Sequence, residues 1–102
     1  MEPNPIIDLF IRSARKLRVD DQGVAAGVHD PQELGLLAGL AQVTYFTTRG
    51  DSPIELAVSA FAALTGGLLE CADRGIEAGA IARRWVAMRC ELVELQIAAN
   101  PG

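Results

Sequence analysis

Histidine, cysteine and phosphate-binding loops, from which many catalytic and metal sites are built, are scarce in this sequence. Its 102 residues include one histidine, His29, and two cysteines, Cys71 and Cys90. A carboxylate-bridged metal pair in a helical bundle needs glutamate and histidine three residues apart, and here that spacing joins only acidic residues. The paired glycines after Thr65 lack the lysine of a phosphate-binding loop. These absences predict no metal ion, no cofactor and no catalytic residue, and they disfavour an enzymatic function without ruling it out.

Positive charge is also in short supply. Nine lysines and arginines stand against 13 aspartates and glutamates, which gives a net charge of −4 at pH 7. Proteins that bind DNA or RNA neutralise phosphates with basic side chains, so this balance disfavours a nucleic-acid partner, although it does not exclude one. The chain begins Met1-Glu2-Pro3, which is acidic where a secretory signal peptide would be basic. We therefore expect a cytoplasmic protein.

The two cysteines are not placed for a disulfide bond. If their helices form a hairpin that turns near Gly75, Cys71 and Cys90 are offset by about 15 Å along the helices. A disulfide bond requires Cα atoms within about 7 Å of each other. The sequence therefore predicts two reduced thiols that pack as small hydrophobic side chains.

Apolar residues, by contrast, are abundant and make up 50% of the chain. The stretch from Leu56 to Leu69 has no charged residue, and it follows Ser52, Pro53 and Glu55. A capping serine, a proline at the first position and an acid three residues after the cap mark the start of a helix. Because a membrane span needs about 20 apolar residues, this stretch and the uncharged stretch 34–48 predict buried helices and no membrane span.

Two further start signals and one stop signal divide the rest of the chain. Asn4 and Asp30 are capping residues followed by proline, and Gly75 ends the central helix. Residues 19–30 contain two glycines and three aspartates and predict a loop, and we find no strand pattern. The sequence predicts one all-α domain over residues 1–102, a small bundle packed around the central helix. Its four helices are expected near 4–18, 31–48, 53–74 and 76–99.

The last helix carries a regular apolar seam that predicts an interface. Apolar residues alternate at spacings of four and three over two heptads, with a second apolar stripe beside them. We expect a two-fold partner to cover this seam, since two-fold dimers are the commonest way to close such a surface. The alternative is that the first helix covers it within one chain. The expected interface residues of a homodimer are Ile81, Trp85, Met88, Leu92 and Leu95.

With little catalytic chemistry and surplus apolar surface, the sequence favours a non-enzymatic interaction module. We expect a homo-oligomeric scaffold or a regulator whose protein partner the sequence does not identify. A small molecule of apolar character, bound between helices, is a second possibility.

A third possibility is a helix-turn-helix DNA-binding regulator over residues 31–53. Residues 32–40 resemble the first helix and turn of that motif, with a glycine of this stretch as the turn. Residues 49–53 resemble the stop and restart after the recognition helix in phage-repressor-like domains. On this reading residues 41–49 form the recognition helix. Its base-reading side chains would be Gln42, Thr44, Thr47 and Arg49.

Overall fold

The first three helices begin at the predicted caps. The computed structural model describes residues 4–99. The helices are α1 (Pro5–Arg15), α2 (Pro31–Thr47), α3 (Pro53–Arg74) and α4 (Gly79–Ala99). The side chains of Asn4, Asp30 and Ser52 each accept a hydrogen bond from a backbone N–H in the first turn of the following helix. Helix accounts for 74% of the structure, and the four helices pack against one another, which confirms the predicted all-α bundle.

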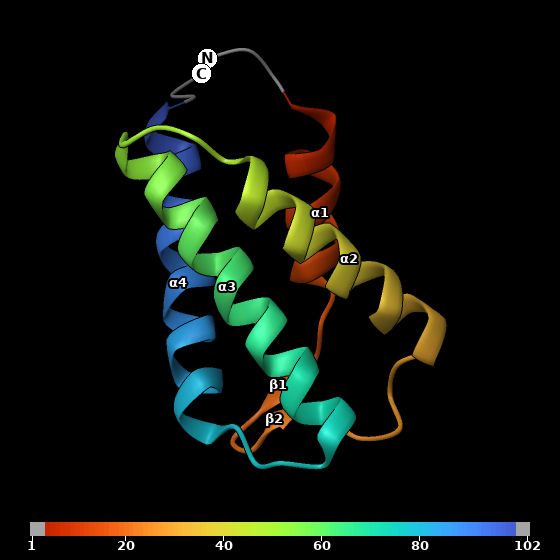
Figure 1. Ribbon diagram of the computed structural model, residues 1–102. Coiled ribbons are helices and arrows are strands. Elements are labelled where there is room, and N and C mark those ends of the chain that lie inside the picture. The colour runs from red at the N-terminus through yellow and green to blue at the C-terminus, as the bar shows by residue number, and fades with distance from the viewer. Residues whose placement is uncertain (1–3, 100–102) are drawn as a thin grey trace.

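Helix α3 is the central element of the bundle, as predicted. It lies between α2 and α4, and α1 lies behind α2 in the view of Figure 1. Seven of its residues are buried, among them Phe61, Leu68 and Leu69. By length and composition α3 is also apolar enough to cross a membrane, a test that the core helix of a soluble protein passes equally.

Three aromatic rings from three different helices form the centre of the core. Phe61 of α3 lies between Phe10 of α1 and Trp85 of α4, with ring centroids 5.7 Å and 5.3 Å away. Each of the three rings is at most 1% exposed. The hydroxyl of Thr65 accepts a hydrogen bond of 2.9 Å from Trp85 Nε1 and donates one to the carbonyl of Phe61. The core is therefore built where α1, α3 and α4 meet.

A short β-hairpin corrects the expectation of a loop without strands. β1 (Val19–Asp20) pairs antiparallel with β2 (Gly23–Val24) at the end of the bundle where α3 ends and α4 begins (Figure 1). The backbone N–H of Ala78 donates a hydrogen bond to the carbonyl of Gln22. Residues 76–78 link α3 to α4, and Ala78 in this link is hydrogen-bonded to the hairpin, so α4 starts at Gly79, three residues later than predicted.

Candidate functional site

The predicted interface seam on α4 lies inside the single chain. Trp85 and Leu92 are 0% and 2% exposed, and they belong to the same apolar cluster as Phe10 of α1 and Phe61 of α3. The other three members of the seam are half-buried against this cluster: Ile81, Met88 and Leu95. The chain's own helices therefore cover the centre of the seam, which removes the reason for placing a dimer interface there. Dimerisation itself stays a prediction.

The residues proposed to read DNA do not share one face. Gly35 and Gly39 both lie inside the continuous helix α2, so the turn expected within the helix-turn-helix of residues 31–53 is not present. Thr44 is fully buried, and the Thr47 hydroxyl donates to the carbonyl of Val43. Gln42 and Arg49 are exposed. Because Thr44 points into the core, the four side chains cannot approach a groove of DNA together.

Helix α2 instead has a long apolar face that no other helix covers. Its core side carries Leu37, Ala41 and Thr44. On the opposite side Leu36 is 71% exposed and Phe46 is 61% exposed. We call this side the outer face, and it consists of Gly35, Leu36, Gly39, Gln42, Val43 and Phe46, all exposed. Gln42 is the one polar member of this face, and exposed apolar side chains gathered on one face are typical of interaction sites.

Charge is confined to the two ends of α2. Asp30 and Glu33 lie at its beginning, Arg49 lies just beyond its end, and no charged residue separates Glu33 from Arg49. Within residues 4–99, none of these three side chains forms an ion pair. The outer face itself is therefore uncharged, because Glu33 lies one turn before Leu37 on the core side of α2 and Arg49 lies beyond the end of the helix.

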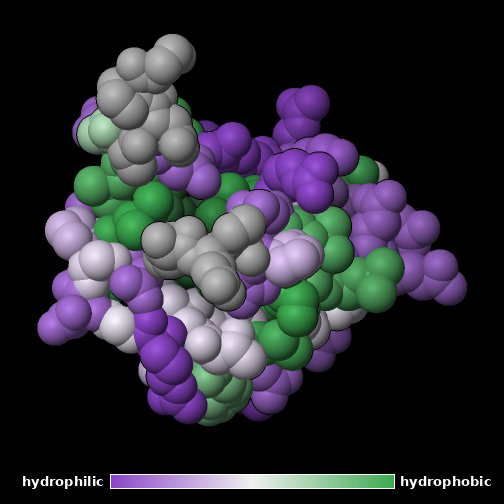
Figure 2. Space-filling view, turned by 90° about the horizontal axis from the view of Figure 1, so that it is seen from above, coloured by the Kyte–Doolittle hydropathy of each residue, from purple (hydrophilic) through white to green (hydrophobic). Residues whose placement is uncertain are grey.

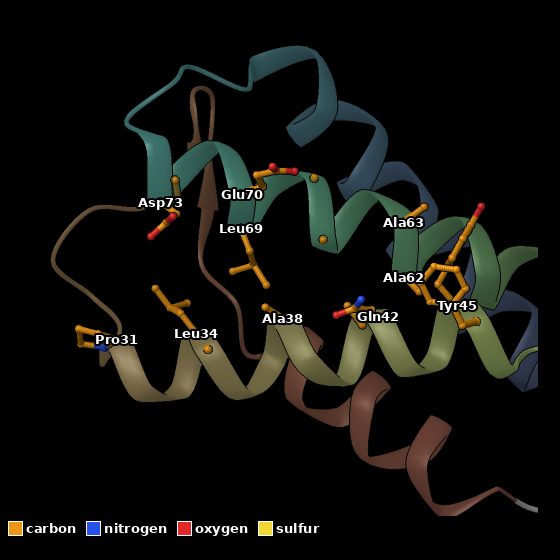
Figure 3. Close-up of a pocket in the computed structure, with 16 residues that line it drawn as sticks. Pro31, Leu34, Ala38, Gln42, Tyr45, Ala62, Ala63, Leu69, Glu70 and Asp73 are labelled. Carbon is orange, nitrogen blue, oxygen red and sulfur yellow. The ribbon is translucent and has the colours of Figure 1, made fainter.

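A groove of about 650 Å³ runs between α2 and α3, and Gly35, Gln42 and Phe46 of the outer face form one of its edges. Leu34 and Ala38 of α2 point toward α3, and Leu69 of α3 points toward α2 (Figure 3). Tyr45 lies at one end of the groove and Asp73 at the other. Most of the remaining lining residues are alanine or glycine, so the side chains that line the groove are short and mainly apolar.

The end of the bundle where α1 begins and α4 ends carries further exposed apolar side chains. Viewed from this end, hydrophobic surface appears as green patches that hydrophilic side chains separate (Figure 2). Ile6, Leu56 and Ile97 are exposed and belong to the helix ends on this side of the molecule. This end offers interrupted apolar surface, whereas the outer face of α2 offers an uninterrupted uncharged row.

The chemically reactive side chains of the described part of the chain are dispersed. Within residues 4–99 no three side chains of His, Cys, Asp or Glu are grouped so that they could hold a metal ion. His29 lies in the loop before α2, where its Nε2 accepts a hydrogen bond from the backbone N–H of Arg18. Cys71 and Cys90 are free thiols, and Cys90 is exposed rather than packed. The exposed apolar side chains of the outer face can bind apolar groups of another molecule.

The sequence contained a signal for the outer face. Residues 34–48 have no charge for 15 positions, the same property that marked α3 as central. A helix that is apolar on every side belongs in an interior. Since α2 has this composition but only one covered side, the part that is left exposed marks the candidate site. Neither the family models, nor the curated proteins, nor the solved structures compared with this chain match it.

Proposed function

We propose that this protein is a non-enzymatic interaction module that docks an apolar helix of a partner protein on the outer face of α2. The observation that carries the proposal is the exposure of Leu36, Val43 and Phe46 on a face without charge. Burying a side chain such as Leu36 or Phe46 contributes about 1.5–3 kcal/mol. Two such anchors on one helix match the way a few residues supply most of the affinity of an interface.

A photo-crosslinking amino acid at position 36 tests this function in the cells that make the protein. We expect it to form adducts with another polypeptide, because a partner helix would cover Leu36. Mass spectrometry of the adducts should identify a helical, uncharged segment as the contact. The matched control is the same amino acid at position 76, since Ile76 is 55% exposed and lies between α3 and α4, away from the outer face.

Two outcomes would contradict the proposed function. One is that position 36 gives no more adduct than position 76. The other is that the contact segments recovered at position 36 are charged loops rather than apolar helices. Circular dichroism of both labelled proteins should match that of the wild type, because both positions are exposed.

The groove between α2 and α3 favours a second candidate function, the binding of a small apolar molecule. Its volume of about 650 Å³ falls within the range of about 300–1,000 Å³ that is usual for ligand pockets. Its lining is mainly apolar, with Tyr45, Gln42 and two carboxylates as the polar groups that would orient a ligand.

Replacing Gly66 with glutamate tests the groove. Gly66 lines it, and a Cβ added there meets no atom within 4 Å, so the side chain should enter the groove without disturbing the fold. We expect a neutral apolar dye such as Nile red to bind at least about tenfold more weakly, because a charge would occupy apolar space. Gly39→Glu is the control, since Gly39 has the same free space but does not line the groove. Equal dye binding by the two variants would remove this candidate.

A further inference from the structure

We propose that the groove between α2 and α3 binds a small molecule that has an apolar chain and one terminal ammonium group, with the ammonium beside Asp73. This inference rests on the second candidate function, the binding of a small apolar molecule, and names the class of ligand. The groove supports this choice because its two ends differ. One end carries charge of a single sign, and the rest of the lining carries none.

The charged end of the groove lies where α2 begins and α3 ends. Glu70 and Asp73 of α3 line it, and Asp73 points toward the start of α2 (Figure 3). Glu70 forms an ion pair of 3.0 Å with Arg74, whereas Asp73 forms none within residues 4–99. The groove therefore presents one carboxylate whose charge no ion pair with a described side chain neutralises.

The surroundings of this end do not cancel the charge of Asp73. The start of α2 and the end of α3 are opposite ends of two helix dipoles, so their partial charges offset each other. The capping residue of α2, Asp30, is itself an acid. Lys16 and His29 line a different hollow, between α1 and α2, together with Glu33. We therefore expect a positively charged ligand group at the end of the groove with Asp73.

The rest of the groove fits an unbranched apolar chain. Ala41, Ala62 and Leu69 are its buried lining residues and form its floor. At the end away from Asp73 lie the rings of Tyr45 and Phe46, with centroids 5.3 Å apart. Such surfaces can bury hydrocarbon, and they offer no partner to a second charged group, which would be costly to bury there.

The separation of the two ends sets the length of the ligand. Ala62 and Asp73 are the first and last residues of α3 that line the groove, about 16 Å apart at 1.5 Å per residue. A saturated chain of about twelve carbons has this length, because each C–C bond of about 1.5 Å advances a zigzag chain by a little less than that. Dodecylammonium therefore matches the groove in length and in charge.

Displacement of Nile red from the purified full chain tests this class of ligand. Dodecylammonium and dodecanoate have similar tails and opposite charges at pH 7, and both are added at concentrations far below those that form micelles. We expect dodecylammonium to displace the dye at an about tenfold lower concentration, because an exposed carboxylate attracts one head group and repels the other, each by about a few-fold in affinity.

Two substitutions of Asp73 identify the carboxylate that is responsible. Asp73→Asn should reduce the preference for dodecylammonium to less than about threefold, and Asp73→Lys should reverse it in favour of dodecanoate. Both variants should keep the fold, which circular dichroism verifies, because Asp73 is exposed and forms no ion pair within residues 4–99. Glu91→Gln and Glu91→Lys are the matched controls. They change the net charge equally at an exposed position of α4 that does not line the groove, so they should keep the preference of the wild type.

Failure of this inference differs from failure of the second candidate function. Equal displacement by the two probes, or Asp73 variants that behave like the Glu91 variants, would overturn the ammonium ligand. If Gly66→Glu still weakens dye binding in that case, the groove remains a site for apolar molecules. If Gly66→Glu and Gly39→Glu bind the dye equally, the groove is not the site and both proposals are wrong.

Discussion

Replacing Trp85 with alanine is expected to lower the free energy of unfolding by about 3–5 kcal/mol. The indole is fully buried, it stacks on Phe61 at 5.3 Å, and the guanidinium of Arg89 lies 4.9 Å from its centroid. Removing it leaves a cavity at the point where three helices meet and takes the donor away from Thr65. Because a domain of this size is stable by only about 5–15 kcal/mol, the variant should lose much of its stability. Urea denaturation followed by circular dichroism measures the loss.

Trp85→Phe is the matched control for the cavity. It keeps an aromatic ring against Phe61 but lacks the N–H that reaches Thr65, so we expect a smaller loss, about 1–2 kcal/mol. A loss below about 1 kcal/mol for Trp85→Ala would contradict the central place of the indole in the core.

The oligomeric state of folded Trp85→Ala separates the two possible interfaces. If the seam on α4 were the interface, this variant would become a monomer. If the outer face of α2 is the interface, the fraction that remains folded should keep the oligomeric state of the wild type, because Trp85 is buried within one chain. Sedimentation at a urea concentration below the unfolding transition makes this comparison.

Thr65→Val and Thr44→Val are expected to change stability in opposite directions. Valine has nearly the same shape as threonine, so each substitution tests only the hydroxyl. At Thr65 the change leaves the buried Trp85 N–H without its acceptor and should lower the free energy of unfolding by about 1–3 kcal/mol. At Thr44 the buried Oγ1 has no hydrogen-bond partner among the described residues, so removing it should raise the free energy of unfolding by about 1 kcal/mol.

The two threonine variants serve as controls for each other. Both residues are 0% exposed and lie on helices, so differences in burial or helix propensity do not account for a difference in sign. Chemical denaturation midpoints, measured under identical conditions, provide the comparison. A Thr65→Val variant that is as stable as the wild type would show that the hydrogen bond between Thr65 and Trp85 does not stabilise the core. A Thr44→Val variant that is less stable than the wild type would contradict the prediction for Thr44.

Local chemistry accounts for what the sequence alone determined. The starts of α1, α2 and α3 were predicted to within a residue, because a cap and the N–H that it accepts from lie only two or three residues apart. The end of α3 was also predicted, since Gly75 adopts the left-handed conformation with φ of 68°. The central position of α3 followed from its composition, because the uncharged stretch from Leu56 to Leu69 gives the helix no polar side that could face water.

Tertiary structure decided the rest, because periodicity states which residues share a face but not what covers that face. The hairpin at 19–24 was missed, since two-residue strands are too short to show a pattern and are held by the distant Ala78. The sequence predicted that a partner would cover the apolar seam of α4, and it predicted no such partner for α2. The packing of Phe10 and Phe61 around Trp85 covered the face of α4. Helix α2 packs against its neighbours through Leu37, Ala41 and Thr44, which leaves Leu36 and Phe46 in solvent. Which side of α2 is covered depends on how helices far apart in the sequence cross, and the local sequence does not encode that.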